Sequence, residues 1–165
     1  MIKMRTFAAA AVAAASLALG VAATPASAAP APNGSTIVSV QSITESPDST
    51  STIGGSCPAP VHDGAPAAPY LCGTRVTRLI WSGNRIEYVL VGTDRRIWHT
   101  YQTTANGPWS SWDLLGDSSD VQDGVWVLDY NSSPLLWLTG SNGGQWCNTI
   151  NSSGTWTNWF SCQIG

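Results

Sequence analysis

The chain has 165 residues, of which 43% are apolar and only 10% are charged, with nine Trp and four Cys. This composition excludes a disordered chain, a nucleic-acid-binding protein and a long multidomain enzyme, and it predicts one small domain. After residue 28 the chain has no Lys, five Arg and ten acidic residues, so its formal charge is −5 and it would repel a phosphate backbone.

Residues 1–28 have the pattern of a secretory signal peptide. Lys3 and Arg5 precede an apolar run at 7–23, and the small residues Ala-Ser-Ala at 26–28 form a typical cleavage site. A membrane anchor is the alternative, but the run consists mainly of Ala, is no longer than a signal core and is followed by prolines. We therefore expect a secreted, extracellular protein that has no membrane contact after cleavage.

The four cysteines are expected to form two disulfides, because secreted proteins mature in an oxidising compartment. Three pairings are possible. Cys57 and Cys72 are 15 residues apart, as are Cys147 and Cys162, and this equal local spacing favours 57–72 and 147–162 over crossed pairings. Neither pair has CxxC spacing and the chain has only two His, so we expect no metal site and no cofactor.

The segment 29–75 is rich in Ser, Pro and Ala and contains no Trp. Within it, residues 35–43 predict one β-strand, because β-branched residues alternate with polar neighbours. Residues 44–75 are predicted to form a loop held by the first disulfide. All nine Trp lie beyond this segment, so the compact domain is predicted at 76–165.

An internal repeat occupies the tryptophan-rich part of the chain, with copies at 76–117 and 121–165. Two segments match between the copies, first at an offset of 48 residues and then of 47: 92–102 (GTDRRIWHTYQ) with 140–150 (GSNGGQWCNTI), and 107–112 (GPWSSW) with 154–159 (GTWTNW). One residue is therefore missing from the second copy, between its two motifs.

Each copy predicts four short strands separated by turn residues. The predicted strands are 76–81, 85–91, 96–102 and 109–115 in the first copy, and 124–130, 135–139, 145–150 and 156–162 in the second. No segment has a convincing helical pattern. Four strands in a repeat of this length match a β-propeller blade, so the predicted fold is all-β, with two antiparallel four-stranded propeller-type blades stapled by disulfides.

The second disulfide also predicts a strand register. If Cys147 faces Cys162, the last hairpin turns at residues 154–155, a two-residue type II′ loop with Gly first. The same register in the first copy pairs His99 with Leu115 and places the loop at 106–108. The one-residue difference between the copies then falls inside a turn, where it does not shift the strands.

The two motifs of the first copy resemble the blades of the tectonin and Photorhabdus-lectin-like β-propellers. Those repeats carry a Gly-x-Asp-x-x-(aromatic)-His-x-x-Gln strand, matched by residues 92–102, and a Gly-x-Trp-x-x-Trp-x-x-Leu-Gly strand, matched by residues 107–116. The resemblance is clear over 76–117, weaker over 121–165 and absent from 29–75. It implies carbohydrate binding at sites on or between blades.

The second copy departs from the family pattern, because Cys147 and Ile150 stand where His99 and Gln102 do in the first. The number of blades departs as well, since propellers usually have four to eight. A closed ring would then require a homo-oligomer, in which the strand at 35–43 could complete the edge of a blade. An uncovered sheet edge would otherwise favour aggregation.

The Trp-x-x-Trp motifs supply the candidate binding residues. Because side chains alternate along a strand, Trp109 and Trp112 are predicted to lie on opposite faces, as are Trp156 and Trp159. One Trp of each pair would pack in the core, and the other would stack on the apolar face of a sugar ring. Polar groups for the sugar hydroxyls are predicted beside the turn that follows Gly92: Asp94, Arg95 and His99.

Each of these residues also has a structural interpretation. The Trp could all be core residues, and Trp98 and Trp146, in mid-strand, are the strongest core predictions. Asp94 and Arg95 could be turn residues, and a His in such a strand is more often hydrogen-bonded within the blade than to a ligand. The sequence favours a secreted, non-catalytic, lectin-like protein that binds a glycan or polysaccharide.

Two other functions remain open from the sequence. One is a structural or protein-interaction module whose Trp surface serves oligomer assembly. The other is an extracellular hydrolase, for which Glu87 in a predicted strand is the main candidate, although no hydrolase motif occurs. An acidic cluster between the copies could bind calcium, but its spacing fits no EF-hand and Asp is common in turns: Asp113, Asp117, Asp120 and Asp123.

Overall fold

The computed structural model describes residues 36–43, 53–118, 120–128, 134–152 and 154–164. In these ranges the fold is all-β and its sheets are antiparallel. The predicted signal peptide at 1–28 lies outside them. The strands are β1 (Ile37–Ile43), β2 (Ser56–Pro58), β3 (Pro69–Leu71), β4 (Val76–Trp81), β5 (Ile86–Val91), β6 (Ile97–Tyr101), β7 (Asp113–Leu114), β8 (Trp126–Leu128), β9 (Leu135–Thr139), β10 (Gln145–Thr149) and β11 (Phe160–Ser161).

Strands β4 to β7 form a first meander and strands β8 to β11 form a second, in agreement with the four strands predicted for each copy. The last strand of each is much shorter than predicted. The turns explain why the strands stop where they do. Gly83 and Asn84 take positive φ angles of 83° and 62° between β4 and β5, and Arg95 takes 58° between β5 and β6. Such angles end regular extended structure.

The N-terminal segment contributes two further elements. Strand β1 confirms the predicted strand and pairs antiparallel with β4, so the first sheet has five strands. The prediction of a loop over 44–75 is wrong where it can be tested, because β2 and β3 pair with each other; residues 44–52 lie outside the described part. Both strands have only three residues and are flanked by Pro and Gly, so they give almost no alternating pattern.

Both predicted disulfides are present. Cys57 on β2 is joined to Cys72 just after β3, and Cys147 on β10 is joined to Cys162 just after β11. No other cysteine is present in the chain, so none is free. We call residues 53–73, which contain the first disulfide, the stapled segment.

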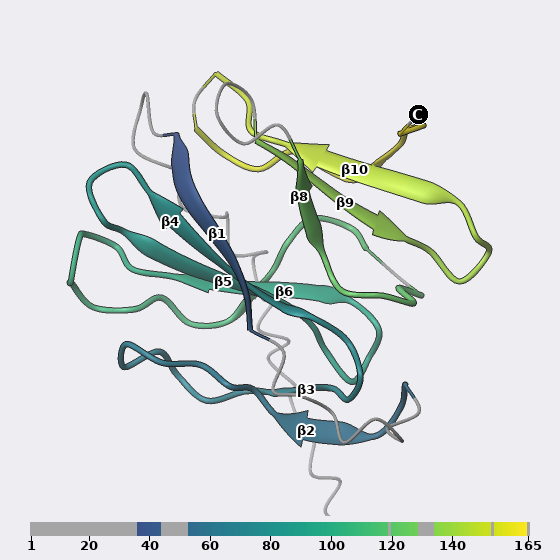
Figure 1. The fold of residues 1–165 in the computed structure, drawn as a ribbon, viewed down its shortest axis with the longest axis horizontal. Helices are drawn as coiled ribbons and strands as arrows, with labels where there is room; N and C mark the ends of the chain where they lie inside the picture. The colour runs from purple at the N-terminus through teal and green to yellow at the C-terminus, as the bar shows by residue number, and fades with distance from the viewer. Residues whose placement is uncertain (1–35, 44–52, 119, 129–133, 153, 165) are drawn as a thin grey trace, which may run out of the picture.

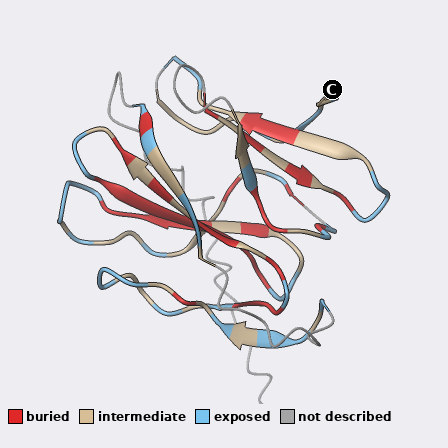
Figure 2. Cartoon of the chain, in the orientation of Figure 1, coloured by how far each residue is buried: buried red, intermediate tan, exposed pale blue. Residues whose placement is uncertain are grey.

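The molecule has three layers, with the stapled segment below the first sheet and the second meander above it (Figure 1). We call the face of each meander that carries the mid-strand Trp (Trp98 or Trp146) its front face, and the opposite face its back face. The front face of the first meander packs on the stapled segment. The front face of the second meander packs on the back face of the first, and buried residues concentrate in β5 and β6 between these layers (Figure 2).

The predicted strand register is wrong by two residues in both copies. Cys147 pairs with Phe160, not Cys162, and His99 pairs with Asp113, not Leu115. The loops are longer than the predicted tight turns: in the second copy the Gly154 N–H donates to the Asn151 carbonyl, 2.9 Å away. A shift of two residues leaves every side chain on its own face, so the assignment of faces within the strands is unaffected.

The predicted separation of the Trp-x-x-Trp side chains onto opposite faces is also wrong. Trp109 and Trp112 both pack against the cluster beneath the first meander, and Trp156 and Trp159 both pack against the cluster between the meanders. The chain is not in a regular strand at residues 110–112 or 157–159, so strict alternation does not hold there.

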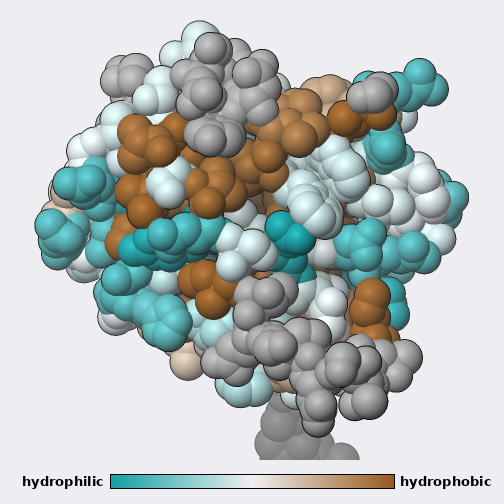
Figure 3. Space-filling model, in the orientation of Figure 1, coloured by the Kyte–Doolittle hydropathy of each residue, from teal (hydrophilic) through white to brown (hydrophobic). Residues whose placement is uncertain are grey.

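One patch of apolar surface follows β1. Figure 3 shows apolar side chains gathered over this strand, with hydrophilic groups beside it. Val38 is 55% exposed, whereas Ile37, next to it, is buried in the core between the two meanders. Strand β1 is the last strand of its sheet and covers the edge of β4, as expected for a strand at 35–43 that completes the edge of a repeat.

Candidate functional site

Two surface pockets occupy equivalent positions in the two meanders, with volumes of about 370 Å³ in the first and 310 Å³ in the second. These volumes lie at the lower end of the roughly 300–1,000 Å³ typical of small-molecule sites. The repeat offset relates six lining residues of one pocket to six of the other: Leu90 and Leu138, Gly92 and Gly140, Thr93 and Ser141, Asp94 and Asn142, Trp98 and Trp146, Trp112 and Trp159.

The turn between the second and third strands builds the polar rim of each pocket. In the first meander the Gly92 N–H donates to the Arg96 carbonyl at 2.8 Å, and in the second the Gly140 N–H donates to the Gly144 carbonyl at 2.9 Å. Arg95 has a φ of 58° and its counterpart Gly143 has 76°, so the two turns share one backbone conformation. Asp94 and Asn142, two residues after these glycines, therefore place their polar side chains at the pocket rims.

The same glycines explain why the mid-strand Trp rings are not covered. A Cβ on Gly92 would lie 2.7 Å from the Trp98 ring, and a Cβ on Gly140 would lie 3.1 Å from Trp146 Nε1. Glycine is thus required for the ring to approach the turn this closely. Trp98 and Trp146 are half-buried: each packs against a hydrophobic cluster, as predicted, and also lines a pocket, which was not predicted; Trp81 is the fully buried Trp.

The second Trp of each Trp-x-x-Trp motif joins its meander to the preceding layer by a hydrogen bond beside the pocket. Trp112 Nε1 donates to the Pro66 carbonyl at 2.9 Å, and Trp159 Nε1 donates to the Leu115 carbonyl at 2.6 Å. Each pocket consequently lies between its own meander and the preceding layer, which is the stapled segment for the first and the end of the first meander for the second.

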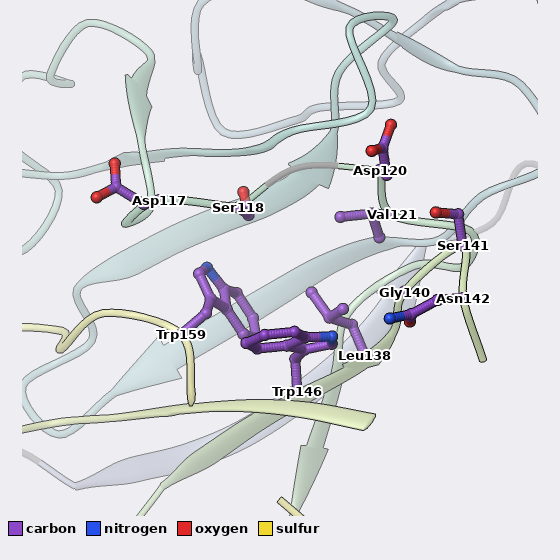
Figure 4. Close-up of a pocket in the computed structure, with 10 residues that line it drawn as sticks. All are labelled: Asp117, Ser118, Asp120, Val121, Leu138, Gly140, Ser141, Asn142, Trp146 and Trp159. Carbon is purple, nitrogen blue, oxygen red and sulfur yellow. The ribbon is translucent and has the colours of Figure 1, made fainter. Parts of the chain in front are cut away.

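The remaining walls differ between the pockets. The first is closed by the small and apolar residues at 67–69 (Ala-Ala-Pro). The second is closed by the connection between the meanders, which contributes two exposed carboxylates, a serine and one apolar side chain: Asp117, Asp120, Ser118 and Val121. In Figure 4, Trp146 and Trp159 lie together on one side of this pocket, and Asp117 and Asp120 lie apart along the opposite side.

Three of the predicted binding residues lie at the pockets, namely Asp94 and Trp112 in the first and Trp159 in the second. Arg95 lies on the turn but does not line either pocket; its Nη1 contacts the Val121 carbonyl at 3.5 Å. Trp109 lies away from both pockets. It stacks on Tyr88 at 5.5 Å between ring centroids and donates from Nε1 to the Asp63 carbonyl.

The other predicted binding residues belong to a buried cluster around Glu87. This carboxylate, only 2% exposed, lies within hydrogen-bond distance of three nitrogens, each 2.7–3.0 Å away: Trp81 Nε1, Trp156 Nε1 and His99 Nδ1. His99 is 1% exposed, so the structure removes it from any surface site. Trp156 comes from the second meander and the other three residues from the first, so the cluster joins the two meanders.

The same region contains a buried cation, Arg85. Arg85 is 6% exposed, and its guanidinium lies 5.5 Å from the Trp81 ring centroid. Burial lowers the pKa of Arg85, and the charge of Glu87 partly offsets this effect. Glu87 thus has a structural role that accounts for its position, as an acceptor for buried donors beside a buried cation.

The acidic residues between the two copies do not assemble into a metal site. Within the described ranges, no group of three or more His, Cys, Asp or Glu side chains is placed to hold a metal ion. The structure therefore gives no support to the calcium alternative. The described residues also contain no helix that is long and apolar enough to cross a membrane.

No known family model and no curated protein matches this sequence. The chemistry of the two pockets is therefore the basis for assigning a function. Sequence reasoning missed Ser141 and Asn142 as pocket residues, although the offset of 48 residues that relates them to Thr93 and Asp94 was available.

Proposed function

We propose that the protein is a secreted, non-catalytic carbohydrate-binding protein with one sugar site in each meander, and that the meanders are propeller-type blades. The observation that carries the proposal is the recurrence of one pocket, built by the same six positions, in both repeats. A core packing role alone would bury these side chains, whereas four of them in each pocket are exposed or half-buried. The two disulfides agree with an extracellular location.

The lining residues suit a neutral saccharide. Each pocket combines two indole rings with a hydroxyl side chain and an Asp or Asn. An indole ring can stack on the apolar face of a pyranose, and the polar groups at the rim can bond to its hydroxyls. Neither set of lining residues contains Lys or Arg, so an acidic polysaccharide would meet carboxylates without a compensating positive charge.

A glycan array followed by calorimetry with the best glycan tests this proposal. We expect two sites per chain in the mature protein, one site in Trp98→Ala or Trp146→Ala, and no binding in the double variant. Trp126→Ala is the matched control, because this side chain is 41% exposed but lines neither pocket. Folding of each variant is checked by near-UV circular dichroism. Unchanged binding by a folded double variant, or no binding to any glycan, would contradict the proposal.

A second candidate function is self-assembly through the back face of the second meander. One row crosses all four of its strands: Trp126, Trp137, Cys147 and Phe160. Trp126 and Phe160 are 41% and 44% exposed, and neither of the two hydrophobic clusters of the described residues includes them. The corresponding face of the first meander is covered by the second meander, so this type of surface already forms one interface within the chain.

The occupant we infer for this face is the same face of a second copy. A head-to-tail contact would require the front face of another first meander, and the stapled segment already covers that face. A two-fold, self-complementary contact remains. Sedimentation should show a dimer that Phe160→Ser and Trp126→Ser dissociate, while sugar affinity per site stays unchanged. A wild-type monomer at high concentration contradicts this assembly, and higher oligomers of increasing size contradict its two-fold geometry.

A further inference from the structure

The two pockets differ in one hydrogen bond. In the first pocket, Trp98 Nε1 donates to the Asp94 carboxylate, 3.1 Å from Oδ1 and 3.3 Å from Oδ2. Asp94 Oδ1 also accepts the Arg96 N–H at 3.1 Å, which closes the turn. The carboxylate has two oxygens and enough lone pairs for both donors, so the indole N–H of the first pocket is already occupied before any ligand arrives.

In the second pocket the position of Asp94 is held by Asn142. Its single oxygen accepts the Gly144 N–H at 2.9 Å, which is the equivalent turn hydrogen bond. Its Nδ2 group is a donor and cannot accept a hydrogen bond from an indole, and its oxygen, although it has a second lone pair, makes no hydrogen bond with Trp146 Nε1. In the described part of the chain, no acceptor makes a hydrogen bond with Trp146 Nε1, and Gly140 has no side chain to cover this atom.

We propose that the two pockets recognise different sugars: the second selects an N-acetylated sugar through the open Trp146 N–H, the first binds a sugar ring by stacking and rim hydrogen bonds without an indole donor, and the Asp94/Asn142 position sets this difference. The inference rests on the proposed function and specifies the ligand of its second site. An N-acetyl group has a carbonyl that can accept from the indole, an amide N–H that can donate, and a methyl group that favours apolar contact.

The walls of the second pocket suit these three parts of the group. The exposed carboxylates of Asp117 and Asp120 can accept the amide N–H. The half-buried rings of Trp146 and Trp159 provide apolar surface for the methyl group, whereas Val121 and Leu138 are only 0% and 3% exposed. The first pocket has alanines and a proline where the second has these carboxylates, so it offers neither a free indole donor nor a second acceptor there.

Reciprocal exchange of the two residues tests the inference. Asp94→Asn and Asn142→Asp keep the size of the side chain at exposed positions, so both variants should fold. The first measurement uses the free protein and follows exchange of the indole N–H protons with water by NMR, with signals assigned through Trp98→Phe and Trp146→Phe. We expect the Trp146 proton to exchange about tenfold or more faster than that of Trp98, since a charge-assisted hydrogen bond protects the latter. Asp94→Asn should speed the proton exchange of Trp98, and Asn142→Asp should slow that of Trp146. Equal rates in the wild type would overturn the inference.

The second measurement titrates N,N′-diacetylchitobiose and cellobiose, which differ only in acetamido and hydroxyl groups. Diacetylchitobiose should shift the Trp146 signal and bind about tenfold more tightly than cellobiose. Asn142→Asp should abolish this preference, and Asp94→Asn should create it at Trp98. Equal binding of the two disaccharides, or binding of neither, overturns the inference. Binding of other glycans at the Trp residues would still leave the proposed function standing, whereas a blank glycan array would remove the proposed function itself.

Discussion

Replacing Glu87 by Gln is expected to destabilise the fold without touching either pocket. The carboxylate lies within hydrogen-bond distance of two indole nitrogens and one imidazole nitrogen, and all of these groups are buried or half-buried. The amide keeps only one oxygen. Its NH₂ group must therefore face an N–H donor whose hydrogen bond the carboxylate accepted. The negative charge that offsets Arg85 is also lost.

The expected cost is about 3–5 kcal/mol, the usual penalty for breaking a buried charged network by removing one partner. For a domain of this size it corresponds to a fall in Tm of roughly 10–20 °C. The assay is urea unfolding followed by Trp fluorescence, and the reported quantity is the free energy of unfolding at constant m-value. Asp117→Asn makes the same chemical change on an exposed side chain and should cost less than about 0.5 kcal/mol.

A Glu87→Gln variant as stable as the wild type would refute the structural role of this carboxylate. The same variant distinguishes a structural role of Glu87 from the hydrolase hypothesis. A hydrolase that uses Glu87 would lose turnover in a folded, stable variant, whereas a structural Glu87 gives a large stability loss and no activity to lose. The two outcomes are measured on one sample, since unfolding and release of a chromogenic sugar can be followed together.

Three further predictions concern stability. Burial raises the pKa of Tyr88 above its ordinary value of 10.0; the unfolded chain ionises first, so stability should be constant below about pH 10 and fall above it, and Tyr88→Phe should lose less stability between about pH 9 and 11. Replacing Cys147 and Cys162 together by Ala opens a 15-residue loop and should cost about 3 kcal/mol in urea unfolding; an unchanged midpoint would argue that the bond adds nothing. Gly124→Ala would place a Cβ 2.6 Å from the Arg75 backbone nitrogen and should cost at least about 1–3 kcal/mol; a variant with the wild-type Tm would show that this close packing is wrong.

The long strands of both meanders could be predicted because turn residues bound them clearly. Strand β4 begins and ends where the sequence predicts, and β5, β6 and β10 agree within one residue at each end. The short strands could not be predicted, because β2 and β3 have three residues each and no alternating pattern. Their pairing depends on contacts with the first meander and on a disulfide that closes around them.

The candidate site was predicted only in part, for a different physical reason. The sequence identifies the motifs but not the geometry of the irregular residues between Trp109 and β7, where alternation fails. It therefore named all four Trp of the Trp-x-x-Trp motifs as binding candidates, although Trp109 and Trp156 line neither pocket. It treated Trp98 and Trp146 as core residues, although they also line the pockets. The missing information is the close approach of each Trp ring to its Gly, which depends on a turn conformation that no residue pattern reports directly.

The hydrogen bond from Trp159 to the Leu115 carbonyl has a consequence for protein engineering. Three of the ten residues that line the second pocket precede residue 121, so residues 121–165 expressed alone would lose Asp117, Ser118, Asp120 and this anchor together. The second repeat alone therefore does not carry the complete site. Transplanting it to another scaffold would require both repeats, and each repeat would have to evolve with its neighbour as a unit.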